Sequence, residues 1–106
     1  RARVTSAQEA GTQRARSLLV CEGEALEASG DAAGALTAWQ KASELRPLAV
    51  FPAALGRYAF GLARALRARG EHARAHALGK QALRHYTAFP GFTRERARIE
   101  AWLIAR

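Results

Sequence analysis

Apolar residues recur along this chain at the spacing of amphipathic helices, and short polar breaks separate the runs. The first run contains Leu18, Leu19, Ala25 and Leu26. It stops at Ser29-Gly30, and the earlier stretch Ser6-Ala7-Gln8-Glu9 reads as a capping box that begins a helix. We therefore expect a first helix from about residue 7 to Ser29.

Gly30 and Asp31 interrupt this periodicity and indicate a turn. Glycine can adopt the left-handed conformation that ends a helix, and an aspartate at this place can cap the next helix. A second apolar run follows at Ala35, Leu36, Trp39, Ala42 and Ser43. It ends before Pro47, because proline cannot continue a helix. The pattern predicts two antiparallel helices joined by a tight turn.

The same arrangement recurs when the chain is shifted by about 40 residues, which aligns Gly30 with Gly70. Recurrence at such a period is typical of stacked helical units. The shift predicts a third helix over 52–69 and a fourth over 72–86. The segment 93–106 then aligns with the first helix of a further unit.

The predicted fifth helix begins at Thr93, which we expect to be its N-cap. Ile99, Trp102 and Leu103 form an apolar stripe along it. We expect this stripe to pack on the preceding helices and close the stack. The composition agrees with an all-α fold, since alanine supplies about a quarter of the residues and 15 of the 17 basic residues are arginine.

Several residues of the first unit match a known repeat signature, W-x2-L-G-x2-Y followed by A-x3-F and a proline. Ala35, Trp39 and Pro47 match its second half. Gly23 and Leu26 match its first half. The unit thereby resembles the tetratricopeptide repeat (TPR) family.

The second unit is similar but departs from the signature, because Gly79 stands where an aromatic residue belongs. The period also exceeds the about 34 residues typical of the family. The chain resembles long-repeat variants in C-terminal arrays of bacterial regulators and Ser/Thr kinases. This resemblance implies antiparallel helix pairs stacked as a TPR-like α-solenoid. One domain would cover 1–106, with an N-terminal helix extension (1–15), two repeats (16–49 and 50–89) and a capping helix (90–106).

Repeats of this kind line a concave groove with the first helix of each unit, which implies the side chains that face a partner. They are Glu24 and Glu27 in the first unit, and Arg57, Phe60, Arg64 and Arg67 in the second. Guanidinium groups beside an aromatic ring suit a carboxylate, a phosphate or an acidic peptide. The resemblance thus implies a non-catalytic protein–protein interaction module that binds a peptide or helix, within a larger bacterial signalling or regulatory protein.

The net charge of +8 lies entirely in the second half of the chain. Residues 1–48 carry six basic and six acidic side chains, whereas residues 49–106 carry eleven and three. Two other functions therefore stay open, nucleic-acid binding along the basic half and self-association through the repeats. The side chains that could contact phosphates are Arg69, Arg74, Lys80, Arg84, Arg94, Arg96 and Arg98.

No motif for catalysis or cofactor binding is recognisable, since neither a glycine-rich phosphate loop nor a nucleophile elbow occurs. His72 and His76 are four residues apart but lack a third ligand. We expect no enzymatic activity, no cofactor and no metal. A single cysteine, Cys21, and the lack of a signal-peptide or membrane-spanning run favour the cytoplasm. Because the chain starts with Arg1 and holds few repeats, we expect a fragment of a longer array.

Overall fold

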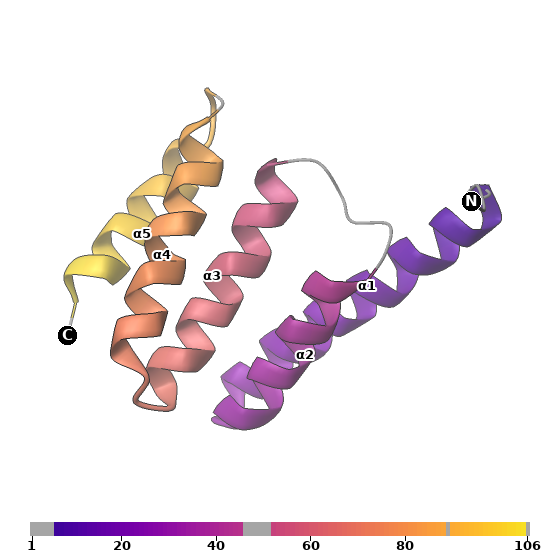
Figure 1. Cartoon of the computed structure of the whole chain (residues 1–106), viewed down its shortest axis with the longest axis horizontal. Coiled ribbons are helices and arrows are strands. Elements are labelled where there is room, and N and C mark those ends of the chain that lie inside the picture. The colour runs from indigo at the N-terminus through magenta and orange to yellow at the C-terminus, as the bar shows by residue number, and fades with distance from the viewer. Residues whose placement is uncertain (1–5, 46–51, 89, 106) are drawn as a thin grey trace.

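The computed structural model describes residues 6–45, 52–88 and 90–105, which form five helices (Figure 1). They are α1 (Ser6–Ala28), α2 (Ala32–Glu44), α3 (Pro52–Ala68), α4 (His72–Thr87) and α5 (Thr93–Ile104). These residues contain no strand, so the predicted all-α class is confirmed. Each helix lies where the sequence predicts it, with its ends within about two residues of those expected.

Two of the connections are tight turns that depend on glycine. The backbone φ angle is 87° at Gly30 and 84° at Gly70, a region that residues with a side chain rarely adopt. After the first turn, the Asp31 carboxylate accepts a 2.9 Å hydrogen bond from the backbone nitrogen of Gly34. Asp31 therefore caps α2, as its place in the sequence predicts.

The start of α5 differs from the expectation. Phe92 occupies the N-cap position and Thr93 is the first helical residue, so the prediction of Thr93 as N-cap is wrong. The chain reverses at Gly91, with φ 105°, which brings Phe92 to the junction. There its ring packs on Tyr86, with the ring centroids 5.3 Å apart. The capping box expected at 6–9 lies outside the described side chains.

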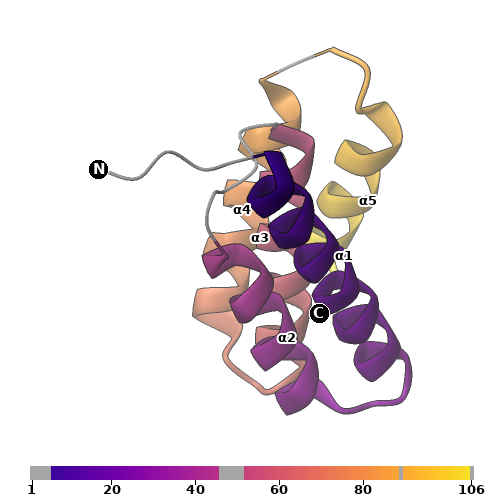
Figure 2. The same ribbon diagram turned by 90° about the vertical axis from the view of Figure 1, so that its right-hand side faces the viewer.

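Each helix packs against the helix that follows it, and α3 occupies the centre (Figure 1). In Figure 1, α1 lies behind α2 and α5 lies behind α4. After a quarter turn, α1 and α5 lie on the same side of the molecule (Figure 2). The backbone of α3 also lies close to that of α1. Side chains of α3 contact α5, as Phe60 and Arg67 do at Trp102. The odd-numbered helices therefore share a surface, which we call the α1–α3–α5 face.

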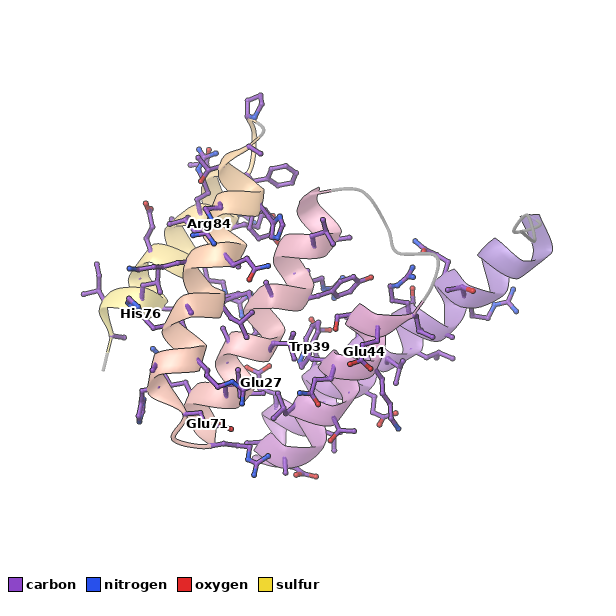
Figure 3. All side chains as sticks on the ribbon, in the orientation of Figure 1. Glu27, Trp39, Glu44, Glu71, His76 and Arg84 are labelled. Carbon is purple, nitrogen blue, oxygen red and sulfur yellow. The ribbon has the colours of Figure 1, made fainter. Side chains whose placement is uncertain are left out.

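The core is organised around an indole that lies between glycines. Trp39 on α2 is fully buried and points between the helices (Figure 3). A Cβ atom on Gly23 of α1 would lie 2.8 Å from its Nε1 atom, and one on Gly61 of α3 would overlap its ring. Glycine at both positions lets α1 and α3 approach the large ring closely.

The same principle explains the glycine that departs from the repeat signature. A Cβ atom on Gly79 of α4 would lie 2.6 Å from the Trp102 ring of α5. In the same way, one on Gly56 of α3 would lie 2.7 Å from the Tyr86 ring of α4. Ile99 of α5 is fully buried beside these contacts. The apolar stripe of the fifth helix thus packs on the preceding helices, as expected.

No helix among the described residues has the length and apolar character needed to cross a lipid bilayer.

Candidate functional site

Two ion pairs join α1 to α3 across the α1–α3–α5 face. Arg57 Nη2 donates to Glu24 Oε2 over 3.0 Å. About two turns further along α3, Arg64 holds the Glu27 carboxylate with two hydrogen bonds, of 2.6 and 3.1 Å. The structure therefore brings four of the sequence-predicted site residues together, but in pairs with each other. The acidic groups that the arginines meet belong to this chain.

The two pairs differ in their exposure to water. The side chains of Arg57 and Glu24 are 54% and 47% exposed. Those of Arg64 and Glu27 are 15% and 35% exposed, and the Arg64 guanidinium lies 4.6 Å from the centroid of the Phe60 ring. Exposed ion pairs are weak, whereas a bidentate and partly desolvated pair is stronger. Arg64 is consequently fixed in place, and Arg57 is the more available cation.

Phe60 lies beneath this surface instead of projecting from it. The residue is only 5% exposed, and its ring meets the Trp102 ring edge to face, with the centroids 5.5 Å apart. The Arg98 guanidinium lies 5.4 Å from the same ring. Phe60 therefore orients the arginines above it by cation–π contacts, and in this structure it offers little apolar surface to a partner.

Arg67 points to a different part of the molecule from Arg57 and Arg64. Its Nη1 atom donates to the backbone carbonyls of Trp102, over 2.7 Å, and Ala105, over 3.2 Å. Its guanidinium also lies 3.9 Å from the centroid of the Trp102 ring. Carbonyls in the last turn of a helix lack intrahelical donors, so Arg67 caps α5. The structure does not bring this residue together with the two ion pairs.

A small depression opens on the α1–α3–α5 face, with a volume of about 70 Å³. Its lining residues are Glu24, Arg57, Phe60, Arg64, Tyr86, Glu95, Arg98 and Ile99. The sequence analysis did not place Glu95 and Arg98 in the groove, although it named Arg98 as a possible phosphate contact and aligned their segment with the first helix of a unit. That alignment alone indicates that α5 shares a face with α1 and α3.

The pKa of Tyr86, which lines this depression, is raised. Burial raises the pKa of Tyr86 above its ordinary value of 10.0, and the nearby Glu95 carboxylate raises it further. Arg57, Arg98 and Arg64 act in the opposite direction on this pKa. Its hydroxyl group therefore stays protonated at neutral pH and can donate a hydrogen bond.

Next to this depression, a second hollow of about 240 Å³ lies between α1 and α3. Arg16 on its wall is only 3% exposed, although the sequence pattern gave no sign of a buried charge there. Its Nη1 atom donates to Gln13 Oε1 over 2.8 Å, and its Nη2 atom to the Leu45 carbonyl over 2.9 Å. A buried arginine thus ties α1 to the end of α2. Burial also raises the pKa of Tyr58, which lines the same hollow.

His72 and His76 lie four residues apart at the start of α4. Among the residues that the structure describes, no three His, Cys, Asp or Glu side chains come together in a way that could hold a metal ion. His72 and His76 instead line a cavity at the end of α5, together with Arg67 and Trp102.

No family model matches this chain, and no match was found among curated proteins or solved structures.

Proposed function

We propose that the chain is a non-catalytic protein-interaction module that binds an acidic peptide or helix on the α1–α3–α5 face. The helix pairs and the turns at Gly30 and Gly70 support a TPR-like stack, in which the first helix of each pair lines the binding surface. The resemblance in sequence supports a place within a larger bacterial signalling or regulatory protein.

The observation that carries this proposal is the half-exposed pair of Arg57 and Glu24 at the edge of a depression that Arg98 also lines. An exposed ion pair contributes little to stability, so a carboxylate from a partner can replace Glu24 at small cost. Arg98 is exposed and has no ion-pair partner among the described residues. These two arginines would bind acidic groups of the partner, with Tyr86 as a neutral hydrogen-bond donor between them.

The other members of the predicted site have supporting roles in this proposal. The bidentate contact between Arg64 and Glu27 keeps α1 and α3 at a fixed spacing. Phe60 lies below Arg64 and Arg98 and orders their guanidinium groups. Arg67 holds the end of α5, which carries Arg98 into the face. A preordered surface loses less entropy when a partner binds.

The test is selection of peptides from a display library against the intact chain, followed by affinity measurements on variants. Arg57→Glu and Arg98→Glu should each weaken the selected peptides by about tenfold or more, because each reverses a charge that contacts the peptide. Arg84→Glu is the matched control, since Arg84 is exposed on α4 (Figure 3). This variant should bind normally.

Three outcomes would contradict the proposal. If the selected peptides lacked acidic residues, Arg57 and Arg98 would not bind acidic groups of a partner as proposed. An equal loss in all three variants, with binding to nucleic acid that falls steeply with salt, would indicate a nucleic-acid surface. A mass that rises with protein concentration, together with no peptide selected, would indicate a self-association module.

A further inference from the structure

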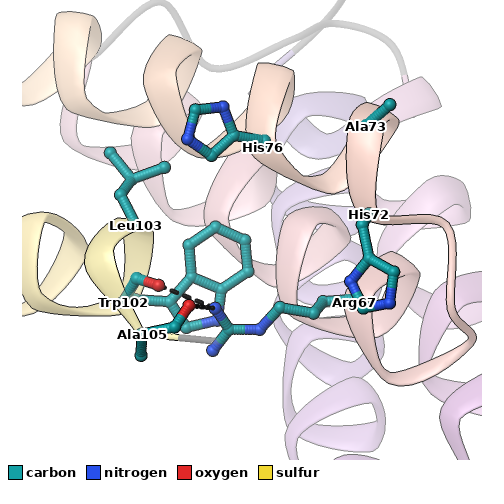
Figure 4. A pocket seen from close by; sticks show the side chains of 7 residues that line it. All are labelled: Arg67, His72, Ala73, His76, Trp102, Leu103 and Ala105. Carbon is teal, nitrogen blue, oxygen red and sulfur yellow. Dashed lines mark hydrogen bonds between the residues drawn. The ribbon is translucent and has the colours of Figure 1, made fainter.

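A larger cavity lies where three helix ends meet, away from the two hollows beside the α1–α3–α5 face. Its volume is about 660 Å³, within the range of sites for small ligands. Arg67 comes from the last turn of α3, and His72 and His76 come from the first turns of α4 (Figure 4). Trp102 and Leu103 come from the last turn of α5. We call this space the end cavity.

Polar groups that donate hydrogen bonds surround the end cavity. Arg67 carries a permanent positive charge, and each imidazole has at least one N–H donor. Among the described residues, none that lines the cavity is acidic. The nearby Glu71 carboxylate accepts a 2.7 Å hydrogen bond from Arg74 instead. The lining therefore favours an anion over a neutral or cationic ligand.

The guanidinium of Arg67 is held rigidly and keeps donors to spare. Its Nη1 atom is engaged by the two backbone carbonyls at the end of α5, and the whole group lies over the Trp102 ring. Its Nε and Nη2 atoms have no hydrogen-bond partner within the described part of the chain. A fixed guanidinium with free N–H groups is suited to a carboxylate, because it loses little entropy on binding.

The remaining wall of the cavity is apolar. Trp102 and Leu103 are half-buried, and Figure 4 shows the indole below His76 in this view, with the Leu103 side chain to its left. Aromatic rings pack on one another edge to face as well as in offset stacks. A ligand that fits this site combines an anionic head with a flat apolar body.

We propose that the end cavity binds a small aromatic carboxylate. The carboxylate lies between the free edge of the Arg67 guanidinium and the imidazoles of His72 and His76. The aromatic ring packs against the Leu103 side chain and the edge of the Trp102 indole, because the Arg67 guanidinium covers one face of the indole. The peptide is bound by other arginines, Arg57 and Arg98, so ligand binding in the end cavity does not depend on the peptide surface.

A nuclear magnetic resonance titration with 3-phenylpropionate tests this site. The chain contains two tryptophans, so two indole N–H signals are expected, and the Trp102→Phe variant identifies the one from Trp102. The probe should shift the Trp102 signal and the amides of 72–76 in a saturable way, with a Kd of about 1 mM or below. The buried Trp39 should not respond. The uncharged analogue 3-phenylpropanamide should bind at least about tenfold more weakly, because it cannot form an ion pair with Arg67.

Substitutions separate the site from general effects of charge. His76→Ala and Arg67→Lys should each weaken 3-phenylpropionate by about fivefold or more, the latter because an ammonium cannot reproduce the planar fork. His85→Ala is the control, since it lies on the same helix about 13 Å further along. Circular dichroism establishes that each variant is folded.

Four results would overturn the proposal. The first two are chemical shifts that do not saturate with 3-phenylpropionate, and equal affinities for the amide and the acid. The third is an equal loss of affinity in His76→Ala and His85→Ala, and the fourth is complete displacement of the probe by inorganic phosphate at equal concentration. The last would assign the site to a bare anion without an aromatic body.

Discussion

The indole ring of Trp39 on α2 fills the space that the missing side chain of Gly61 leaves on α3. This contact brings α2 against α3. The same kind of contact, an aromatic ring against a glycine, joins Tyr86 to Gly56 and Trp102 to Gly79. Neighbouring helices therefore approach one another where large aromatic side chains pack on glycine backbones.

Gly61→Ala should destabilise the protein because the new methyl group would overlap the Trp39 ring. We expect a loss of about 1–3 kcal/mol, which exceeds the gain in helix propensity of about 1 kcal/mol. Urea unfolding followed by circular dichroism measures the difference. Gly11→Ala is the matched control, because a Cβ atom there meets nothing within 4 Å. It should stabilise α1, and a stabilising effect of Gly61→Ala as well would disprove the contact.

The two ion pairs between α1 and α3 should contribute unequally to stability. Double-mutant cycles with alanine should give a coupling of about 1 kcal/mol for Arg64 and Glu27, and below about 0.5 kcal/mol for Arg57 and Glu24. The reason is that the first pair is bidentate and less exposed. Raising the salt concentration should reduce the second coupling further. Equal couplings would mean that burial does not distinguish the pairs.

Arg67→Ala should loosen the end of α5 before it affects the other helices. The substitution removes two hydrogen bonds to the carbonyls of Trp102 and Ala105 and the cation–π contact with the indole. We expect a loss of about 1–2 kcal/mol in the free energy of unfolding. Amide hydrogen exchange should accelerate first at 100–105. Arg69→Ala, an exposed arginine two residues away, should change stability by less than about 0.5 kcal/mol.

Alkaline pH should destabilise the fold through its tyrosines. Burial raises the pKa of Tyr58 and Tyr86 above 10.0 in the folded state. In the unfolded chain both groups lose their protons near the ordinary value, so the unfolded state binds fewer protons above it. Stability from these groups is therefore complete below pH 10 and is lost as the pH rises through the folded-state values.

Absorbance of tyrosinate measures this effect directly, since the sequence contains two tyrosines. The titration midpoint should lie above 10.0 in the native protein and move down in urea. Glu95→Gln should lower the pKa of Tyr86, because the Glu95 carboxylate helps to raise it. A native midpoint at or below the midpoint in urea would contradict the burial of both hydroxyl groups.

The positions of the helices were predictable because their signals are local. Glycine at positions 30 and 70 determines where the chain can take a positive φ. Asp31 caps α2 by accepting a hydrogen bond from Gly34, only three residues further along the chain. Such signals act within one turn of the helix and need no knowledge of the fold. The exception, Thr93, failed as an N-cap because the neighbouring Gly91 and the packing of Phe92 on Tyr86 shifted the junction.

The sequence by itself determined the all-α class, the helix boundaries and the sharing of one helix by Arg57, Phe60 and Arg64. Only the tertiary structure decided what these side chains contact. Arg57 and Arg64 meet glutamates 33 and 37 residues away, and Arg67 meets carbonyls 35 and 38 residues away. A helical period specifies which residues share a face, but the approach of another helix selects their partners. That approach depends on which glycines admit which aromatic rings, as Trp39 and Gly61 do here.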